Sequence, residues 1–93
     1  MTKINIPLWI KILVYIKGHE HEKNTVRSIA NGCNTDAGYM AILIKELEQS
    51  KLLNITQDKK HMRRNIYKLT EIGEKLAVAS IPIMKFFSIK DKE

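Results

Sequence analysis

The stretch from Leu43 to Leu76 constrains the fold more than any other part of this chain. Its first part, which ends in KELEQSKLL, has the spacing of an amphipathic helix. The runs LLNIT and IYKLT then predict two short strands on either side of the polar, cationic segment QDKKHMRRN. The phrase TEIGEKL begins another helix directly after the second strand. The sequence therefore predicts a helix, a hairpin with a basic tip and a further helix.

Length and charge favour one small, basic, globular domain. The chain has 93 residues, of which 44% are hydrophobic, and this composition does not favour disorder. A core of this size gives a monomer only modest stability, and oligomerisation is one way to bury more apolar surface. The net charge of +6 favours a polyanionic partner, with nucleic acid as the first candidate and an anionic membrane surface as the second.

Two features favour a cytoplasmic protein. The apolar run IPLWIKILVYI is interrupted by Lys11, precedes no small-residue cleavage site and is too short to span a bilayer. We therefore interpret it as a core helix rather than a targeting segment. The single cysteine, Cys33, excludes an intramolecular disulfide and suits a reducing compartment, although a bridge between two subunits stays open.

Capping residues predict where the first helices begin and end. Pro7 suits the first turn of a helix that Gly18 ends. A second helix starts after Asn24 or Thr25, either of which can cap it, and ends at Gly32. The segment NGCNTD that follows is typical of the tight turn in a helix-turn-helix.

The third helix is expected to run from a cap at Thr35 or Asp36 to about Ser50. Its predicted inner face is the stripe of apolar side chains at i, i+4 and i+8: Tyr39, Leu43 and Leu47. Its predicted outer face holds the remaining side chains: Ala37, Met40, Ala41, Ile44, Lys45 and Glu48.

The last helix carries more apolar surface than one small core needs. It opens at Thr70 with an acidic first turn, which suits the helix dipole, and Pro82 should kink or split it. One face repeats apolar residues at helical spacing: Leu76, Ala79, Ile83 and Phe87.

From about Asn24 to Leu76 the chain resembles winged helix-turn-helix regulators of the PadR and MarR types. These proteins commonly end their third helix in L-x-x-L-E-x-x-G-L-I and begin their last helix in L-T-x-x-G. The matching residues are Leu43, Leu47, Glu48, Leu52 and Leu53, then Leu69, Thr70 and Gly73. Lys51 stands where the family usually has glycine. The resemblance implies one winged-helix domain over residues 1–93, mainly α with a small β-hairpin, in the order α-α-α-β-β-α.

By this resemblance the third helix is a recognition helix, which lies in the major groove of DNA. The candidate contacts are Asn34, Thr35, Gly38, Tyr39, Met40, Ala41 and Lys45. The set is poor in side chains that read bases bidentately, so apolar contacts with thymine methyls and DNA shape are expected to carry much of the specificity. For Tyr39, core packing and DNA contact are both open interpretations.

The tip of the hairpin is the clearest electrostatic feature. Its basic or potentially basic residues are Lys59, Lys60, His61, Arg63 and Arg64. A run of charge is commonly a solvated loop, but the winged-helix interpretation places this loop beside the duplex and favours phosphate contact. Further cations are candidates for backbone contact, although each alone is more typical of plain surface: Lys23, Arg27, Lys45, Lys51 and Lys68.

In PadR- and MarR-like proteins the terminal helices form a dimer, so the resemblance implies a homodimer through a dimerisation helix at 71–90. The implied interface residues are Leu76, Ile83, Met84 and Phe87. The alternative is that this helix simply packs on the first helix. A dimer with two recognition helices would read a two-fold symmetric site.

Catalysis and metal binding have little support in the sequence. The segment HEHE at 19–22 has no histidine pair at i, i+4 and no paired cysteine. Cys33 has only the distant His61 as an imaginable base, and the chain has no P-loop and no GxGxxG motif. We expect no enzymatic activity, catalytic residue, metal or cofactor.

The sequence therefore favours a homodimeric, sequence-specific double-stranded DNA-binding protein that acts as a transcriptional regulator on nucleoid or plasmid DNA. A second hypothesis is a plasmid-partition or architectural protein that binds a palindromic site, spreads along DNA and works with a second DNA-segregation protein. In size and in Lys/Ile richness the chain resembles small stand-alone winged helices of archaeal plasmids and viruses. A third hypothesis is a winged helix that binds proteins and has no role on DNA.

Overall fold

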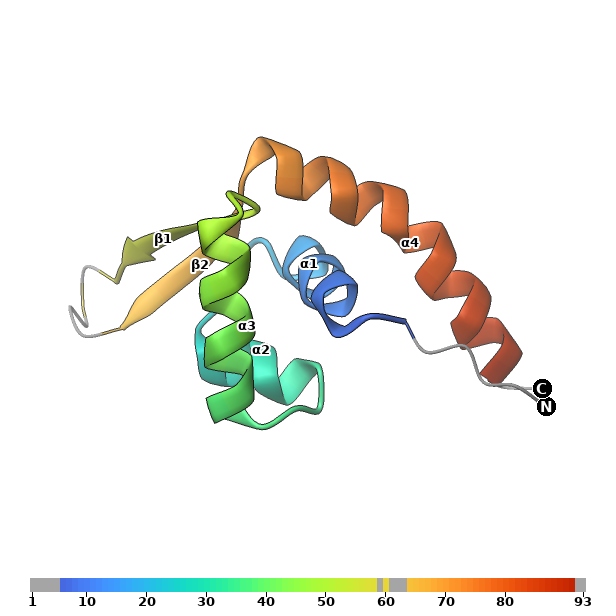
Figure 1. Ribbon diagram of the computed structural model, residues 1–93, viewed down its shortest axis with the longest axis horizontal. Helices are drawn as coiled ribbons and strands as arrows, with labels where there is room; N and C mark the ends of the chain where they lie inside the picture. The colour runs from blue at the N-terminus through green and yellow to red at the C-terminus, as the bar shows by residue number, and fades with distance from the viewer. Residues whose placement is uncertain (1–5, 59, 61–63, 92–93) are drawn as a thin grey trace.

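The computed structural model describes residues 6–58, 60 and 64–91, with side chains up to Lys85. Its elements follow the predicted order: α1 (Leu8–Gly18), α2 (Val26–Gly32), α3 (Ala37–Gln49), β1 (Leu53–Gln57), β2 (Asn65–Leu69) and α4 (Glu71–Asp91). Figure 1 shows α1 at the centre, α2 and α3 on one side of it, and α4 on the other. The hairpin of β1 and β2 projects away from α4 as the wing. The chain is a winged helix, as the sequence predicted.

The two strands of the wing form an antiparallel pair in which Leu53 faces Leu69 and Ile55 faces Tyr67. The loop after α1 adds one bond to the free edge of β2, because the Tyr67 N–H donates to the carbonyl of Asn24 at 2.8 Å. The buried Asn24 side chain donates in turn to the carbonyl of His19 at 3.0 Å. The wing is thereby fastened to the end of α1, a contact that no sequence pattern indicated.

Side-chain caps begin α2 and α3 where the sequence predicted them. Thr25, rather than Asn24, caps α2, and it forms a reciprocal capping box with Ser28. Asp36, rather than Thr35, caps α3, and its carboxylate accepts from the Tyr39 N–H at 3.0 Å.

Both α2 and α3 end in the same backbone motif, with one residue in the left-handed region. Asn34 has a φ of 53° after α2, and Lys51 has a φ of 63° after α3. In each case two backbone N–H groups donate to carbonyls of the last helical turn, as in a Schellman motif. After α3, the Lys51 N–H donates to the carbonyl of Glu48 and the Leu52 N–H donates to the carbonyl of Leu47. The glycine that the family motif has at this position therefore has a physical reason. Lys51 adopts the same conformation at a steric cost.

The core lies between α1 and the helix-turn-helix. It is formed mainly by aliphatic side chains from every element: Ile12, Leu13, Ile16, Ile29, Ala30, Met40, Ile44, Leu47, Leu53, Tyr67 and Ala77.

Helix α4 begins against the turn that follows α3. The Thr70 hydroxyl accepts from the Gly73 N–H at 3.0 Å and donates to the carbonyl of Lys51 at 2.6 Å. A Cβ atom at Gly73 would overlap the carbonyl of Leu52, so only glycine allows this close approach. On the next turn, Glu74 bonds the Lys17 ammonium at 2.6 Å, and this bond raises the pKa of Lys17.

Pro82 does not split α4, which runs as one helix through it, and Figure 1 shows the axis of this helix bending along its length. Among the residues that the structure describes, no helix has both the length and the apolar character needed to cross a membrane.

Candidate nucleic-acid interface

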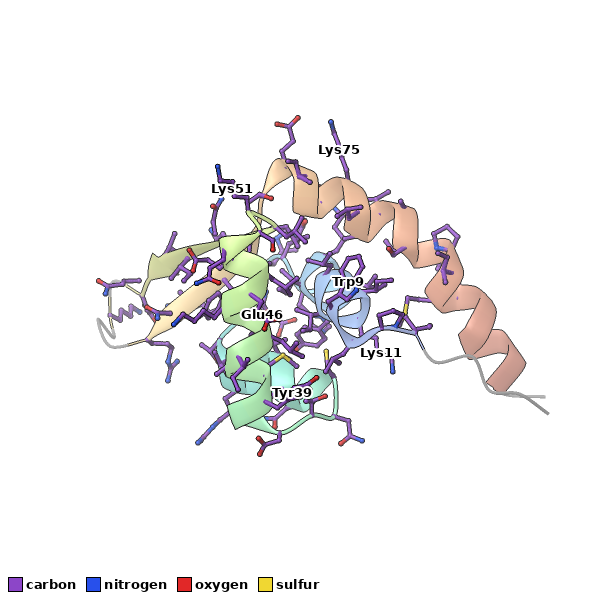
Figure 2. The ribbon with its side chains drawn as sticks, in the orientation of Figure 1. Trp9, Lys11, Tyr39, Glu46, Lys51 and Lys75 are labelled. Atoms are coloured by element: carbon purple, nitrogen blue, oxygen red, sulfur yellow. The ribbon has the colours of Figure 1, made fainter. Side chains whose placement is uncertain are left out.

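The outward face of α3 combines small side chains with two large exposed ones, Tyr39 and Ile42. Gly38 and Ala41 are exposed, and Tyr39 is 52% exposed in the first half of the helix (Figure 2). The core-packing interpretation of Tyr39 is therefore wrong. Lys45 follows on the same outward side, while the acidic residues of the helix proper, Glu46 and Glu48, lie in its second half. The first half of α3 therefore presents no acidic side chain, and Gly38 and Ala41 leave its backbone open to close approach beside Tyr39 and Ile42.

Met40 is a correction to the predicted recognition surface, because it is 0% exposed and lies in the core. The inner stripe of α3 is Met40, Ile44 and Leu47, so the predicted helix phase was wrong by one residue. Nearly every position from 39 to 44 is apolar, so periodicity alone could not choose between the stripes. Packing decides it: the tyrosine hydroxyl stays in water, and the unbranched methionine fills the core.

The turn before α3 holds two further candidates. Asn34 is exposed in the left-handed position that ends α2, a conformation that asparagine tolerates better than most residues. Thr35 is half-buried, and its hydroxyl donates to the carbonyl of Cys33 at 3.1 Å. Asn34 is therefore free to contact a ligand with its side chain, whereas Thr35 is partly committed to the turn.

The base of the wing is fixed by a buried carboxylate. Asp58 is 3% exposed, and its Oδ1 accepts from the Lys23 ammonium at 3.1 Å and from the Lys60 N–H at 3.0 Å. Its own N–H donates to the carbonyl of Arg64, which extends the strand pairing by one bond. Lys60 and Arg64 are exposed, and the other predicted tip cations, Lys59, His61 and Arg63, lie outside the described residues.

A groove with a volume of ≈ 800 Å³ lies between α2 and β2, beside this wing base. Three cationic side chains from three different segments line it: Lys23, Arg27 and Arg64. None of the described residues that line it is acidic. The sequence named these cations only as separate candidates, and the fold brings them together.

Two of the predicted dimer residues, Leu76 and Ile83, are exposed on one side of α4, whereas Met84 follows Ala77 and Ser80 at helical spacing on the side that packs on the domain. Leu76 is 37% exposed, Ile83 is 47% exposed, and Met84 is half-buried. The side chain of Phe87 lies outside the described residues. The face of α4 that meets the rest of the domain begins with small residues, Gly73, Ala77 and Ser80, and continues at the half-buried Met84.

The groups weighed for other chemistry are not assembled into a site. Cys33 is half-buried, and burial raises the pKa of its thiol, which disfavours the reactive thiolate. Within residues 6–58, 60 and 64–91, no group of three or more His, Cys, Asp or Glu side chains is arranged to hold a metal ion.

Comparison with known proteins gives fold matches only among solved structures. A MepR–DNA complex from S. aureus matches with a TM-score of 0.81 and 24% identity, over 92% of this chain and 62% of that one. MepR, described as a transcription regulator of the S. aureus multidrug efflux pump MepA, matches with a TM-score of 0.74 and 26% identity, over 88% and 59%. The adhesin competence repressor AdcR of Streptococcus pyogenes matches with a TM-score of 0.77 and 18% identity, over 94% and 63%.

The chain shares the winged-helix fold of MarR-family regulators. It spans 63% or less of the length of each of these three solved chains. No protein-family model and no curated protein matches the sequence.

Proposed function

We propose that this chain is a homodimeric, sequence-specific double-stranded DNA-binding protein that regulates transcription. The observation that carries the proposal is the outward face of α3, where the first half exposes Gly38 and Ala41 beside two large side chains, Tyr39 and Ile42. That face belongs to a fold whose matches include a regulator solved in complex with DNA. The matches reported above are S. aureus and Streptococcus pyogenes proteins, and they lend no support to an archaeal plasmid or virus type or to a partition role.

In this proposal the first half of α3 enters the major groove. Gly38 and Ala41 let the helix backbone approach the base edges, and Tyr39 supplies apolar contact together with one hydroxyl. Lys45 lies nearer the phosphate backbone. Because none of these side chains reads a base bidentately, DNA shape is expected to contribute much of the specificity.

The wing supplies the contacts that do not depend on sequence. Lys60 and Arg64 are exposed at the two sides of the tip, and we propose that Lys59, His61 and Arg63 join them on the flanking phosphates or in the minor groove.

The dimer is supported by the way α4 distributes its side chains. Its most buried residues, Gly73, Ala77 and Ser80, are small, whereas several of its large apolar side chains are exposed to solvent: Ile72, Leu76, Val78 and Ile83. We propose that Leu76, Ile83, Met84 and Phe87 meet the same residues of a second copy. Two copies would present two α3 helices to a two-fold symmetric site.

A matched pair of variants tests the DNA face. Ala41→Glu places a carboxylate on the outward side of α3, whereas Gln49→Glu adds the same charge at the exposed C-terminal end of that helix. A duplex selected from a random pool and a random duplex are compared in shift assays at one salt concentration. Ala41→Glu should lower the affinity for both duplexes and abolish the preference for the selected one. Gln49→Glu should change the affinity for each duplex by less than about threefold. Equal effects of the two variants would remove α3 from the interface.

Footprinting on the selected duplex separates regulation from coating. A regulator gives a discrete protected site, and its length stays constant as protein concentration rises. A footprint that expands from a central site would contradict the regulator proposal and indicate spreading. Failure of the wild-type protein to bind any duplex at low salt would contradict a role on DNA altogether.

A further inference from the structure

The groove between α2 and β2 contains polar groups that the fold itself does not use. Thr25 and Ser28 are committed, because their hydroxyls form the capping box of α2. The amide side chains of Asn31 and Asn65 also line the groove, and neither forms a hydrogen bond with a residue that the structure describes. The side-chain amides of Asn31 and Asn65 are therefore hydrogen-bond donors that are not used within the described part of the fold.

Of the three cations that line the groove, one is paired within the fold and two are not. The Lys23 ammonium is paired with the buried Asp58, so its charge is largely neutralised within the fold. Arg27 and Arg64 are exposed, and neither is in an ion pair with any described residue. Arg27 comes from the first turn of α2 and Arg64 from the residue before β2, so two guanidinium groups from different elements line one groove.

We propose that this groove binds the sugar-phosphate backbone of DNA, with Arg27 and Arg64 on one phosphodiester and the two asparagine amides beside it. The inference rests on the proposed function and deepens it, because it joins Arg64 of the wing to Arg27 of α2 in a single phosphate site. Guanidinium groups bind phosphate bidentately, and asparagine amides are common donors to phosphate oxygens. The absence of acidic side chains among the described lining residues leaves nothing in the groove to repel the anion.

Lys23 has a different role in this arrangement. Its ion pair with Asp58 joins the loop after α1 to the wing base, and Tyr67 bonds the same loop through Asn24. These bonds hold β2, and with it Arg64, at a fixed distance from α2. Lys23 is therefore a positioning residue for the groove rather than a contact to phosphate.

The first experiment compares Arg27→Ala, Arg64→Ala and the control Lys85→Ala, which removes the same charge from an exposed position on α4. Affinity for the selected duplex and for a random duplex is measured across a salt series. Each arginine variant should lower both affinities by about 10-fold or more, and should reduce the slope of log K against log salt by roughly 1. Lys85→Ala should leave both nearly unchanged, and circular dichroism should show all three folded because the positions are exposed.

The second experiment locates the phosphate. Single methylphosphonates, which are uncharged, are placed in turn along the selected duplex and measured with each protein. One position should weaken wild-type binding about 10-fold and have no further effect on Arg27→Ala or Arg64→Ala, since the contact is already lost. Arg27→Lys should keep the salt slope but recover only part of the affinity, because an ammonium cannot bind bidentately.

The outcomes separate this inference from the proposed function. If Ala41→Glu weakens binding but both arginine variants behave like Lys85→Ala, the groove is not a phosphate site and the DNA-binding proposal stands. Equal methylphosphonate penalties in wild type and in both arginine variants would also overturn the groove. If the wild-type protein binds no duplex, both proposals fail together.

Discussion

Helices α3 and α4 both pack on the core, but they use their apolar residues in opposite ways. In α3 the large side chains Met40 and Ile44 point inward and are almost completely buried. In α4 the buried residues are the small Gly73, Ala77 and Ser80, and several large side chains are exposed, with Ile72 at 59% exposure. This chain covers the large side chains of the inner stripe of α3, whereas it leaves several large apolar side chains of α4 exposed.

This difference identifies what each helix is for. A buried stripe of large residues fixes the rotation of α3, so its small outward side chains are presented in one orientation to a partner. Small residues on the inner face of α4 let it lie close to α1 and to the turn after α3, and exposed apolar side chains remain on the rest of the helix. Exposed apolar surface of this extent on one helix is typical of an interface rather than of free surface.

The largest effect is expected from Met40→Ala, which tests the burial of the inner stripe of α3. Removing a fully buried side chain should lower the free energy of unfolding by about 2–5 kcal/mol. Ile42→Ala, on the exposed side of the same helix, should lower it by less than about 1 kcal/mol. Urea denaturation of both variants checks this pair, and equal losses would mean that the assigned face of α3 is wrong.

Leu76→Asp tests the other half of the comparison. A charge in the outward face of α4 should weaken the proposed dimer by about 3 kcal/mol, because it must be buried without a partner. Lys75→Asp adds an acidic group at the neighbouring, highly exposed position and should leave association unchanged. Sedimentation equilibrium at micromolar concentration measures both. A wild-type monomer at that concentration would show that the outer face of α4 is not a dimer interface.

Gly73→Ala tests how closely α4 is docked at its start. The added methyl group overlaps the backbone carbonyl of Leu52, so the variant should be less stable by about 1–3 kcal/mol. Gly38→Ala, at the exposed start of α3, meets only the flexible carboxylate of Asp36 and should be neutral or slightly stabilising. Thermal unfolding distinguishes the two. No loss on Gly73→Ala would mean that α4 can move away from the turn at little cost.

Local chemistry explains which parts of the fold the sequence predicted. The caps at Thr25 and Asp36, the end of α1 at Gly18 and the hairpin all follow from residues that satisfy backbone groups nearby, and the structure confirms them. The family motif around Thr70 also has a local cause, since its hydroxyl joins the start of α4 to the turn after α3.

The features that the sequence did not predict depend on long-range packing. The phase of α3 was missed because apolar residues surround its first half, and only the shape of the core separates Met40 from Tyr39. The groove between α2 and β2 was missed for a related reason. Arg27 and Arg64 are 37 positions apart in the chain, and tertiary contacts bring β2 beside α2, among them the bond from Tyr67 to Asn24 and the ion pair of Asp58 with Lys23.

The smallest predicted effect concerns the turn in which α3 ends and against which α4 begins. Lys51 holds a left-handed conformation there, which costs an L-residue roughly 1–2 kcal/mol, whereas glycine adopts it freely but loses more backbone entropy on folding. Lys51→Gly should therefore stabilise the protein by about 0.5–1 kcal/mol, seen as a higher urea midpoint with an unchanged m-value.

Two controls separate relief of strain from loss of the lysine side chain. Lys51→Ala keeps the strained backbone and removes the exposed charge, so its stability should stay close to wild type. Asn34→Gly makes the same change at the matching end of α2, where asparagine already tolerates the conformation, and should gain little or nothing. If Lys51→Ala stabilised the protein as much as Lys51→Gly, the gain would come from the charge, and the turn between α3 and α4 would carry no backbone strain. If only the glycine variant gains, the chain bears a measurable strain at the joint between the helix proposed to contact DNA and the helix proposed to bind a second copy.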